Sequence, residues 1–80
     1  MTQYYIPPQE VDVTNGPRWP SKFLKKIIER DGLITPILVN RKDDAFYAAD
    51  ERQAERVMAC QELGFETVLL EDEFDPDDLY

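Results

Sequence analysis

The 80-residue sequence has no histidine, a single cysteine (Cys60) and only nine basic residues against seventeen acidic ones, giving a formal net charge of −8. Without histidine the chain cannot form a serine–histidine pair, a histidine zinc site or an imidazole general base. With one cysteine it cannot form an intramolecular disulfide or a thiolate metal cluster. Small secreted domains usually depend on several disulfides, so we expect a cytoplasmic protein.

Long hydrophobic runs are also missing. No apolar run approaches the ~20 residues that a bilayer span requires. The first residues have neither the basic end nor the apolar stretch of a signal peptide. We therefore expect no contact with a membrane. The apolar fraction of 42% and the aromatic fraction of 11% are nevertheless too high for a disordered acidic chain, so the sequence predicts a folded core.

The negative charge is concentrated at the C-terminal end. Residues 71–80 contain six of the seventeen carboxylates and no base, so residues 1–70 are close to neutral. A chain of this length supports one domain at most. We interpret residues 1–70 as a single compact domain and residues 71–80 as an acidic, aromatic C-terminal tail.

Two helices are expected from apolar spacing and capping residues. Ser21 is a plausible N-cap for a helix over residues 22–31, which Gly32 would end in a left-handed conformation. Its apolar stripe consists of Phe23, Leu24, Ile27 and Ile28. Asp50 followed by Gln53 fits a variant capping box for a second helix that runs to about Leu63, with Gly64 as its stop.

Short strands are expected between and beside these helices. Alternating residues 10–13 predict a first strand, residues 37–40 a strand covered on both faces, and residues 45–49 its hairpin partner across a turn at Asp43-Asp44. Residues 66–70 predict the last strand. The fold class is therefore α+β, a small mixed sheet with two helices in the order β-α-β-β-α-β.

Two stretches of this sequence are similar to a known family. Residues 31–39 read Asp-Gly-Leu-Ile-Thr-Pro-Ile-Leu-Val, and residues 63–68 read Leu-Gly-Phe-Glu-Thr-Val. Together with the hairpin and the helix between them they resemble the N-terminal domain of ParB proteins, within the ParB/sulfiredoxin-like superfamily. The resemblance covers roughly residues 6–71 and implies the fold of that group.

The same resemblance implies a place for nucleotide binding. In the family a Gly-Glu-Arg-Arg box opens the second helix, and its arginines bind nucleotide phosphates together with the helix N-terminus. The corresponding stretch here, residues 50–56, is degenerate because it has Asp50 and no glycine. The alternative function is a CTP- or ATP-binding ParB-like module that is a switch or a weak hydrolase, or a DNA-associated regulator. Its nucleotide binding would rest on Arg18, Glu51, Arg52 and Arg56.

A thiol enzyme is not expected. Sulfiredoxin relatives place a reactive cysteine at the start of this helix, whereas Cys60 lies ten residues beyond Asp50 and is expected to pack in the core. Adjacent carboxylates such as Asp43-Asp44 are expected to serve turns and caps, and a magnesium site needs convergent ligands. We predict no catalytic residues, no metal and no cofactor.

Basic residues gather around the first predicted helix. Lys22, Lys26 and Arg30 are spaced by four and share one helix face, with Arg18 and Lys25 close by. This stripe has three interpretations: a solvated face, contact with DNA or RNA, or an acidic protein partner. The net charge argues against direct nucleic-acid binding. Trp19 is interpreted either as packing against the helix start, which is favoured, or as a recognition anchor.

The tail combines carboxylates with aromatic residues, which a segment serving only solubility would not need. Such segments can dock on basic, partly apolar grooves, because charge raises the association rate and rings supply anchors. The first function hypothesis is therefore a non-catalytic acidic binding protein that regulates or inhibits a basic nucleic-acid-handling protein. It would mimic nucleic-acid charge and be of the kind that phages and plasmids encode. Its expected contact residues are Glu71, Asp72, Glu73, Phe74, Asp75, Asp77, Asp78 and Tyr80.

Overall fold

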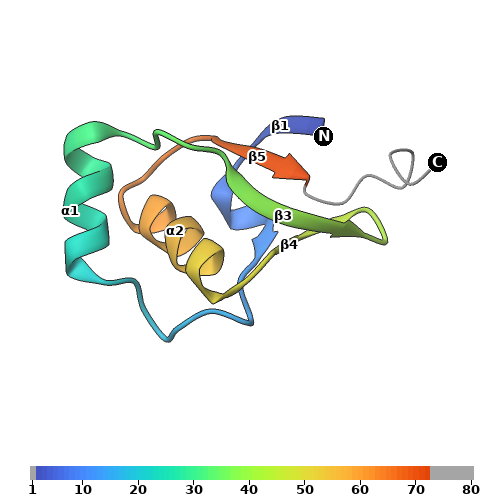
Figure 1. Cartoon of the computed structure of the whole chain (residues 1–80), viewed down its shortest axis with the longest axis horizontal. Coiled ribbons are helices and arrows are strands. Elements are labelled where there is room, and N and C mark those ends of the chain that lie inside the picture. The colour runs from blue at the N-terminus through green and yellow to red at the C-terminus, as the bar shows by residue number, and fades with distance from the viewer. Residues whose placement is uncertain (1, 73–80) are drawn as a thin grey trace.

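The protein forms a five-stranded mixed sheet with two helices in a computed structural model that describes residues 2–72 (Figure 1). The strand order is β1-β5-β3-β4-β2, with β5 parallel to β3 and β2 parallel to β4. This confirms the α+β class. The elements are β1 (Thr2–Ile6), the short 3-10 helix η1 (Pro8–Glu10), β2 (Val11–Asp12), α1 (Lys22–Asp31), β3 (Ile37–Lys42), β4 (Ala45–Ala48), α2 (Glu51–Glu62) and β5 (Val68–Asp72).

The N-terminal segment differs from its prediction. An additional strand, β1, pairs antiparallel with β5, and the strand expected over residues 10–13 is reduced to the two residues of β2. The cause is the pair of prolines after β1, where the 3-10 turn closes with a hydrogen bond from Glu10 N to Pro7 O of 3.0 Å. Glu10 therefore belongs to a turn and does not begin a strand.

The last strand is longer than predicted. It does not end near Leu70, because Glu71 and Asp72 pair with β1 on one side and with β3 on the other. Two acidic residues that we assigned to the tail thus belong to the sheet.

Both helices begin and end as their capping residues predict. The Ser21 side chain accepts from the amides of Phe23 and Leu24, and Gly32 ends α1 with a φ of 77°. At the end of α2, Gly64 has a φ of 79° and the Phe65 amide donates to Cys60 O at 3.1 Å, the hydrogen bond of a Schellman cap.

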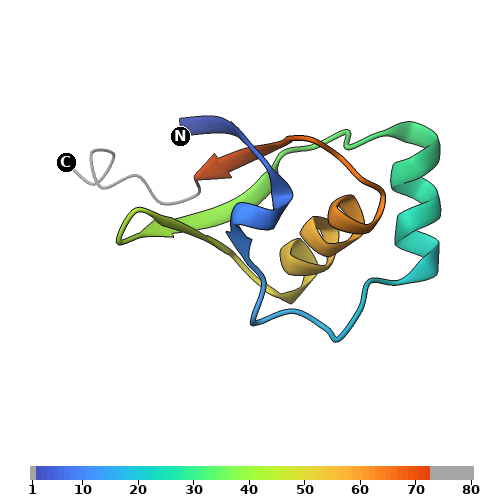
Figure 2. The same cartoon turned by 180° about the vertical axis from the view of Figure 1, so that it is seen from behind.

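The core is built from small and medium apolar side chains. Phe23, expected in the apolar stripe of α1, is 73% exposed, because α1 packs on α2 through the neighbouring face that carries Leu24 and Ile28 (Figure 2). The buried apolar residues are Val11, Ile28, Ile37, Val39, Ala48, Ala54, Val57, Ala59, Cys60, Val68 and Leu70.

One face of the sheet carries most of this core. Along β3, Ile37 and Val39 are fully buried, whereas Leu38 between them is only half-buried. The expectation that this strand is covered on both faces was wrong. The reason is topological, since α2 packs on β3 and β4 while α1 packs on α2.

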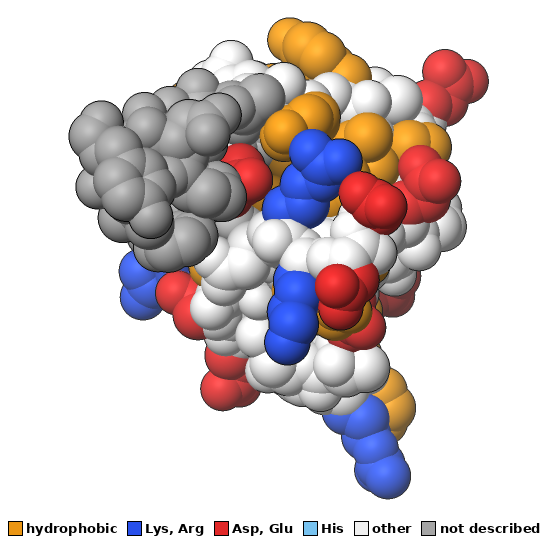
Figure 3. Space-filling model, turned by 90° about the vertical axis from the view of Figure 1, so that its right-hand side faces the viewer, with side chains coloured by type: hydrophobic (Ala, Val, Ile, Leu, Met, Phe, Trp, Pro, Cys, Tyr) orange, Lys and Arg blue, Asp and Glu red, His pale blue; other side chains and the backbone are white. Residues whose placement is uncertain are grey.

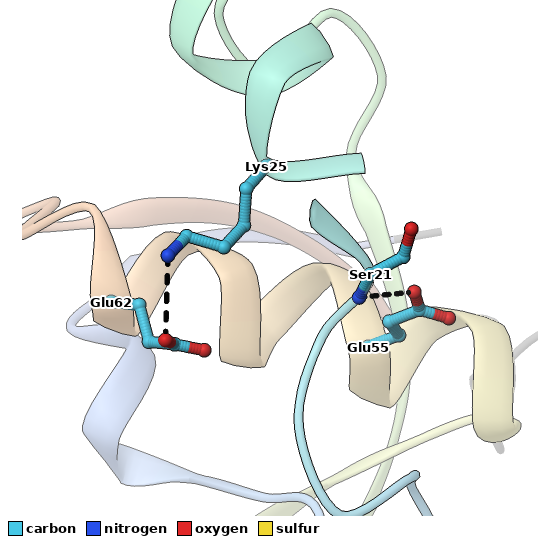
Figure 4. A network of polar contacts seen from close by, with 4 residues as sticks. All are labelled: Ser21, Lys25, Glu55 and Glu62. Carbon is cyan, nitrogen blue, oxygen red and sulfur yellow. Dashed lines mark hydrogen bonds and ion pairs between the residues drawn. The ribbon is translucent and has the colours of Figure 1, made fainter. Parts of the chain in front are cut away.

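Polar contacts fix α1 against α2. The Lys25 ammonium donates to Glu62 across 3.4 Å, and the Ser21 amide donates to the Glu55 carboxylate across 2.9 Å (Figure 4).

The hairpin between β3 and β4 turns at Asp43 and Asp44, whose φ values of 53° and 63° are those of a type I′ turn. Within residues 2–72 no helix is long and apolar enough to cross a membrane.

Candidate functional site

The start of α2, where the family resemblance places phosphate binding, is capped by the chain's own carboxylate. Asp50 Oδ1 accepts from the Gln53 amide at 2.9 Å. A helix N-terminus attracts anions because its first amides lack partners and its dipole is positive there. Here Asp50 already accepts from one of these amides and offsets part of the positive dipole. Its negative charge also repels an incoming phosphate.

The predicted capping box is only half formed. In the reciprocal bond of a capping box, the Asp50 amide would donate to the side-chain oxygen of Gln53. Instead, the nearly buried Gln53 Oε1 accepts from the Leu38 amide of β3 at 3.2 Å and from Arg56 Nη1 at 2.8 Å. Gln53 therefore joins α2 to the central strand.

Arg56 has a structural role that the sequence analysis missed. Its guanidinium donates to Pro36 O at 3.0 Å and to Thr35 Oγ1 at 2.8 Å, and it also contacts Thr35 O. Burial lowers the pKa of Arg56, an effect that the nearby Cys60 opposes. These bonds hold the segment before β3 against α2, so most donors of this predicted phosphate ligand are used within the protein.

The other residues of the nucleotide-binding alternative lie at the surface. Glu51 and Arg52 are exposed in the first turn of α2. Arg18 lies in the loop before α1 with its guanidinium 5.7 Å from the Trp19 ring centre. Trp19 is 67% exposed, so its predicted packing against the helix start is wrong.

Cys60 occupies the core position that was expected for it. Its side chain is fully buried, and this burial raises the pKa of the thiol to about 11, with a partial offset from the Arg56 charge. A thiolate is the reactive form of cysteine. At neutral pH the thiol is therefore both inaccessible and protonated.

The predicted partner-binding residues are divided by the end of β5. Glu71 is half-buried and accepts from Gln3 Nε2 at 3.3 Å. Asp72 is only 6% exposed because it is flanked by β1 and β3, so little of its side chain is available to a partner. The others lie outside the described residues: Glu73, Phe74, Asp75, Asp77, Asp78 and Tyr80.

The basic stripe of α1 is partly neutralised by neighbours. Lys22, Lys26 and Arg30 are exposed, as a shared outer face predicts. Arg30 binds Asp31 through two hydrogen bonds of 2.9 and 3.0 Å, and Lys25 pairs with Glu62. Among the described residues, no group of three or more acidic or cysteine side chains is placed to hold a metal ion.

Two solved structures share this architecture. Sulfiredoxin from Arabidopsis thaliana matches with a TM-score of 0.69 and 22% identity, over 99% of this chain and 92% of that chain. The C-terminally truncated chromosome-partitioning protein ParB from Caulobacter crescentus, complexed with CTP-γ-S, matches with a TM-score of 0.63 and 21% identity. That match covers 95% of this chain but only 47% of the ParB chain. No protein-family model and no curated protein matches the sequence.

The fold is therefore ParB/sulfiredoxin-like, which confirms the resemblance seen in the sequence. At these identities the likeness establishes architecture alone.

The network around Arg56 makes a direct prediction for stability. Arg56→Ala should lower the free energy of unfolding by about 2–3 kcal/mol, because it removes charge-assisted bonds and leaves the carbonyls of Thr35 and Pro36 without this donor. Arg52→Ala, one turn earlier on the exposed face of the same helix, is the matched control and should change it by less than about 0.5 kcal/mol. Urea unfolding measures both. Equal losses of stability in Arg56→Ala and Arg52→Ala would show that Arg56 does not hold the segment before β3 against α2.

The burial of Cys60 predicts its reactivity. At pH 8 a thiol-specific reagent should modify the native protein more than about 100-fold slower than the urea-unfolded chain, where the thiol has its ordinary pKa near 8.5. Because the chain has a single cysteine, the reagent reports on this site alone. Native modification within about tenfold of the unfolded rate would contradict the burial.

Proposed function

We propose that this protein is a non-catalytic acidic binding module that regulates or inhibits a basic nucleic-acid-handling protein. The observation that carries the proposal is the carboxylate of Asp50 at the start of α2, bonded to the Gln53 amide. It occupies the position at which the family resemblance implies phosphate binding. A chain whose own carboxylate occupies the phosphate position is better suited to binding a partner through its surface than to binding a nucleotide there.

The position of Cys60 supports the same conclusion. Thiol chemistry needs an accessible thiolate, and this thiol is buried with its pKa raised to about 11. The chain has no second cysteine and no histidine that could serve in its place. Binding of a partner therefore fits these residues better than thiol catalysis does.

The charge distribution supports a basic partner. β5 leads from the core to the C-terminal segment, whose residues 73–80 contain four carboxylates together with Phe74 and Tyr80. Figure 3 looks at the end of the molecule opposite α1, where acidic side chains are scattered and basic ones lie singly. A groove that normally binds a phosphate backbone would attract this end of the protein, because steering by opposite charge acts before contact.

Nucleotide binding is the second candidate, and the exposure of Arg52 in the first turn of α2 favours it. A lone arginine beside a helix start can hold one phosphate group. Asp50 acts against this function, since it lies on the same turn as the arginine.

Capture experiments test the first function. The full chain should retain nucleic-acid-binding proteins from a cell lysate, and duplex DNA should compete for them. Neutralising Glu73, Asp75, Asp77 and Asp78 as amides should abolish capture, because the segment would lose its charge. The matched control neutralises four exposed carboxylates elsewhere, Glu10, Glu29, Asp43 and Glu66, and should retain it. Equal losses in both variants would show that net charge alone binds the partner.

Thermal unfolding with CTP or ATP and magnesium separates the second function from the first. A nucleotide that binds the native state raises stability by RT ln(1 + [L]/Kd). We expect no rise for the wild type. Asp50→Asn keeps the cap acceptor but removes the charge, and is expected to be the variant most able to gain binding. A nucleotide-dependent rise in the wild type that Arg52→Ala removes would establish the second function.

A further inference from the structure

An apolar hollow lies between α1 and the segment that precedes β3. It has a volume of about 300 Å³, and its walls include Leu24 and Ile27 from α1 and Leu33 and Ile34 from the following segment. Ile34 is 77% exposed. Phe23, one helical turn from Ile27, is 73% exposed, so the apolar surface continues beyond the hollow.

Positive charge surrounds this apolar surface. Arg56 lines the hollow, and all the acceptors bonded to its guanidinium are uncharged: Thr35, Pro36 O and the Gln53 side chain. Within residues 2–72, no carboxylate lies within ion-pair distance of Arg56. Lys26 lies exposed on the outer face of α1, whereas the neighbouring Arg30 is bonded to Asp31. In a chain with a net charge of −8, this is a place where an acidic apolar segment would be attracted.

We propose that this groove binds residues 73–80 of a second copy of the chain. That segment reads Glu-Phe-Asp-Pro-Asp-Asp-Leu-Tyr and combines four carboxylates with three large apolar side chains, Phe74, Leu79 and Tyr80. Its apolar side chains match the walls of the hollow, and its carboxylates match the positive charges of Arg56 and Lys26. The segment and the groove are thus complementary in apolar surface and in charge, and the same chain supplies both.

Geometry favours a second copy over the same molecule. β5 runs away from α1 and ends at Asp72, the last residue that the structure describes (Figure 1). Eight fully extended residues span at most ~29 Å. In the same molecule they would have to reverse and run back past β5 before they met the hollow. A neighbouring molecule can present its groove without this turn.

The contact is heterologous, since the segment of one copy meets the groove of the next. After one such contact, one copy keeps a free groove and the other a free segment, so the pair either closes by a reciprocal contact or adds further copies as the concentration rises. The proposal does not rest on the function proposed above. A basic partner would compete with it for the same segment.

Sedimentation of full-length variants tests the proposal. The groove variant is Lys26→Glu with Ile34→Glu, two exposed positions whose replacement leaves the core intact. Its matched control is Lys42→Glu with Tyr5→Glu, which makes the same charge change and replaces an equally exposed apolar residue on the sheet. The segment variant is Phe74→Ser with Tyr80→Ser and with Asp75, Asp77 and Asp78 as amides.

The wild type and the control should increase in average mass with concentration, and added salt should weaken this association. The groove and segment variants should each associate at least about tenfold more weakly, a difference of about 1.4 kcal/mol. An equimolar mixture of the two variants should form a one-to-one complex and nothing larger, because it contains one intact groove and one intact segment.

Three outcomes would overturn the proposal: a wild type that stays monomeric at millimolar concentration, association unchanged in either variant, or a mixture that stays monomeric. Titration with labelled single-stranded DNA tests whether the groove binds nucleic acid instead. Binding of this DNA that the groove variant loses, in a wild type that does not self-associate, would assign the groove to nucleic acid. Capture of a basic partner is measured separately, so its failure is distinguishable from the failure of self-association.

Discussion

The arrangement of the helices and the sheet depends on how α2 is joined to the start of β3. Arg56 and Gln53, one turn apart on α2, bind the backbone of residues 35–38 through the guanidinium and the side-chain amide. Backbone groups at the entrance of a central strand have no strand partner and must be satisfied by other groups. Because two side chains of one helix supply these bonds, the position of α2 on the sheet and the course of the segment before β3 are fixed together.

This constraint also limits what the site can do. The start of α2, where the family resemblance implies phosphate binding, largely serves the fold: Asp50 caps the helix, Gln53 binds β3 and Arg56 binds the segment before it. Glu51 and Arg52 lie exposed beside them. In this ParB/sulfiredoxin-like fold the start of α2 is therefore a structural junction between the helix and the sheet.

Local signals in the sequence were enough to predict most of the architecture. The caps of both helices, the turn at Asp43-Asp44 and the stop at Gly64 follow from side-chain chemistry within a few residues. Contacts between distant residues were not accessible in this way. The strand β1 exists because β5 offers an edge some 65 residues away, and its pairing extends β5 to Asp72. Likewise, the role of Arg56 depends on Thr35, which lies 21 residues earlier.

The exposed apolar side chains are not equivalent, and the difference bears on where the protein binds. Tyr5 and Trp19 are exposed at the surface, and exposed apolar residues of this kind are normal in soluble proteins. Ile34 instead borders a hollow with apolar walls and a guanidinium that has no acidic partner among residues 2–72. A core of small side chains leaves a domain of this size little stability to spare. An apolar groove kept open beside a half-buried cation is therefore a cost that the binding of an acidic apolar segment would offset.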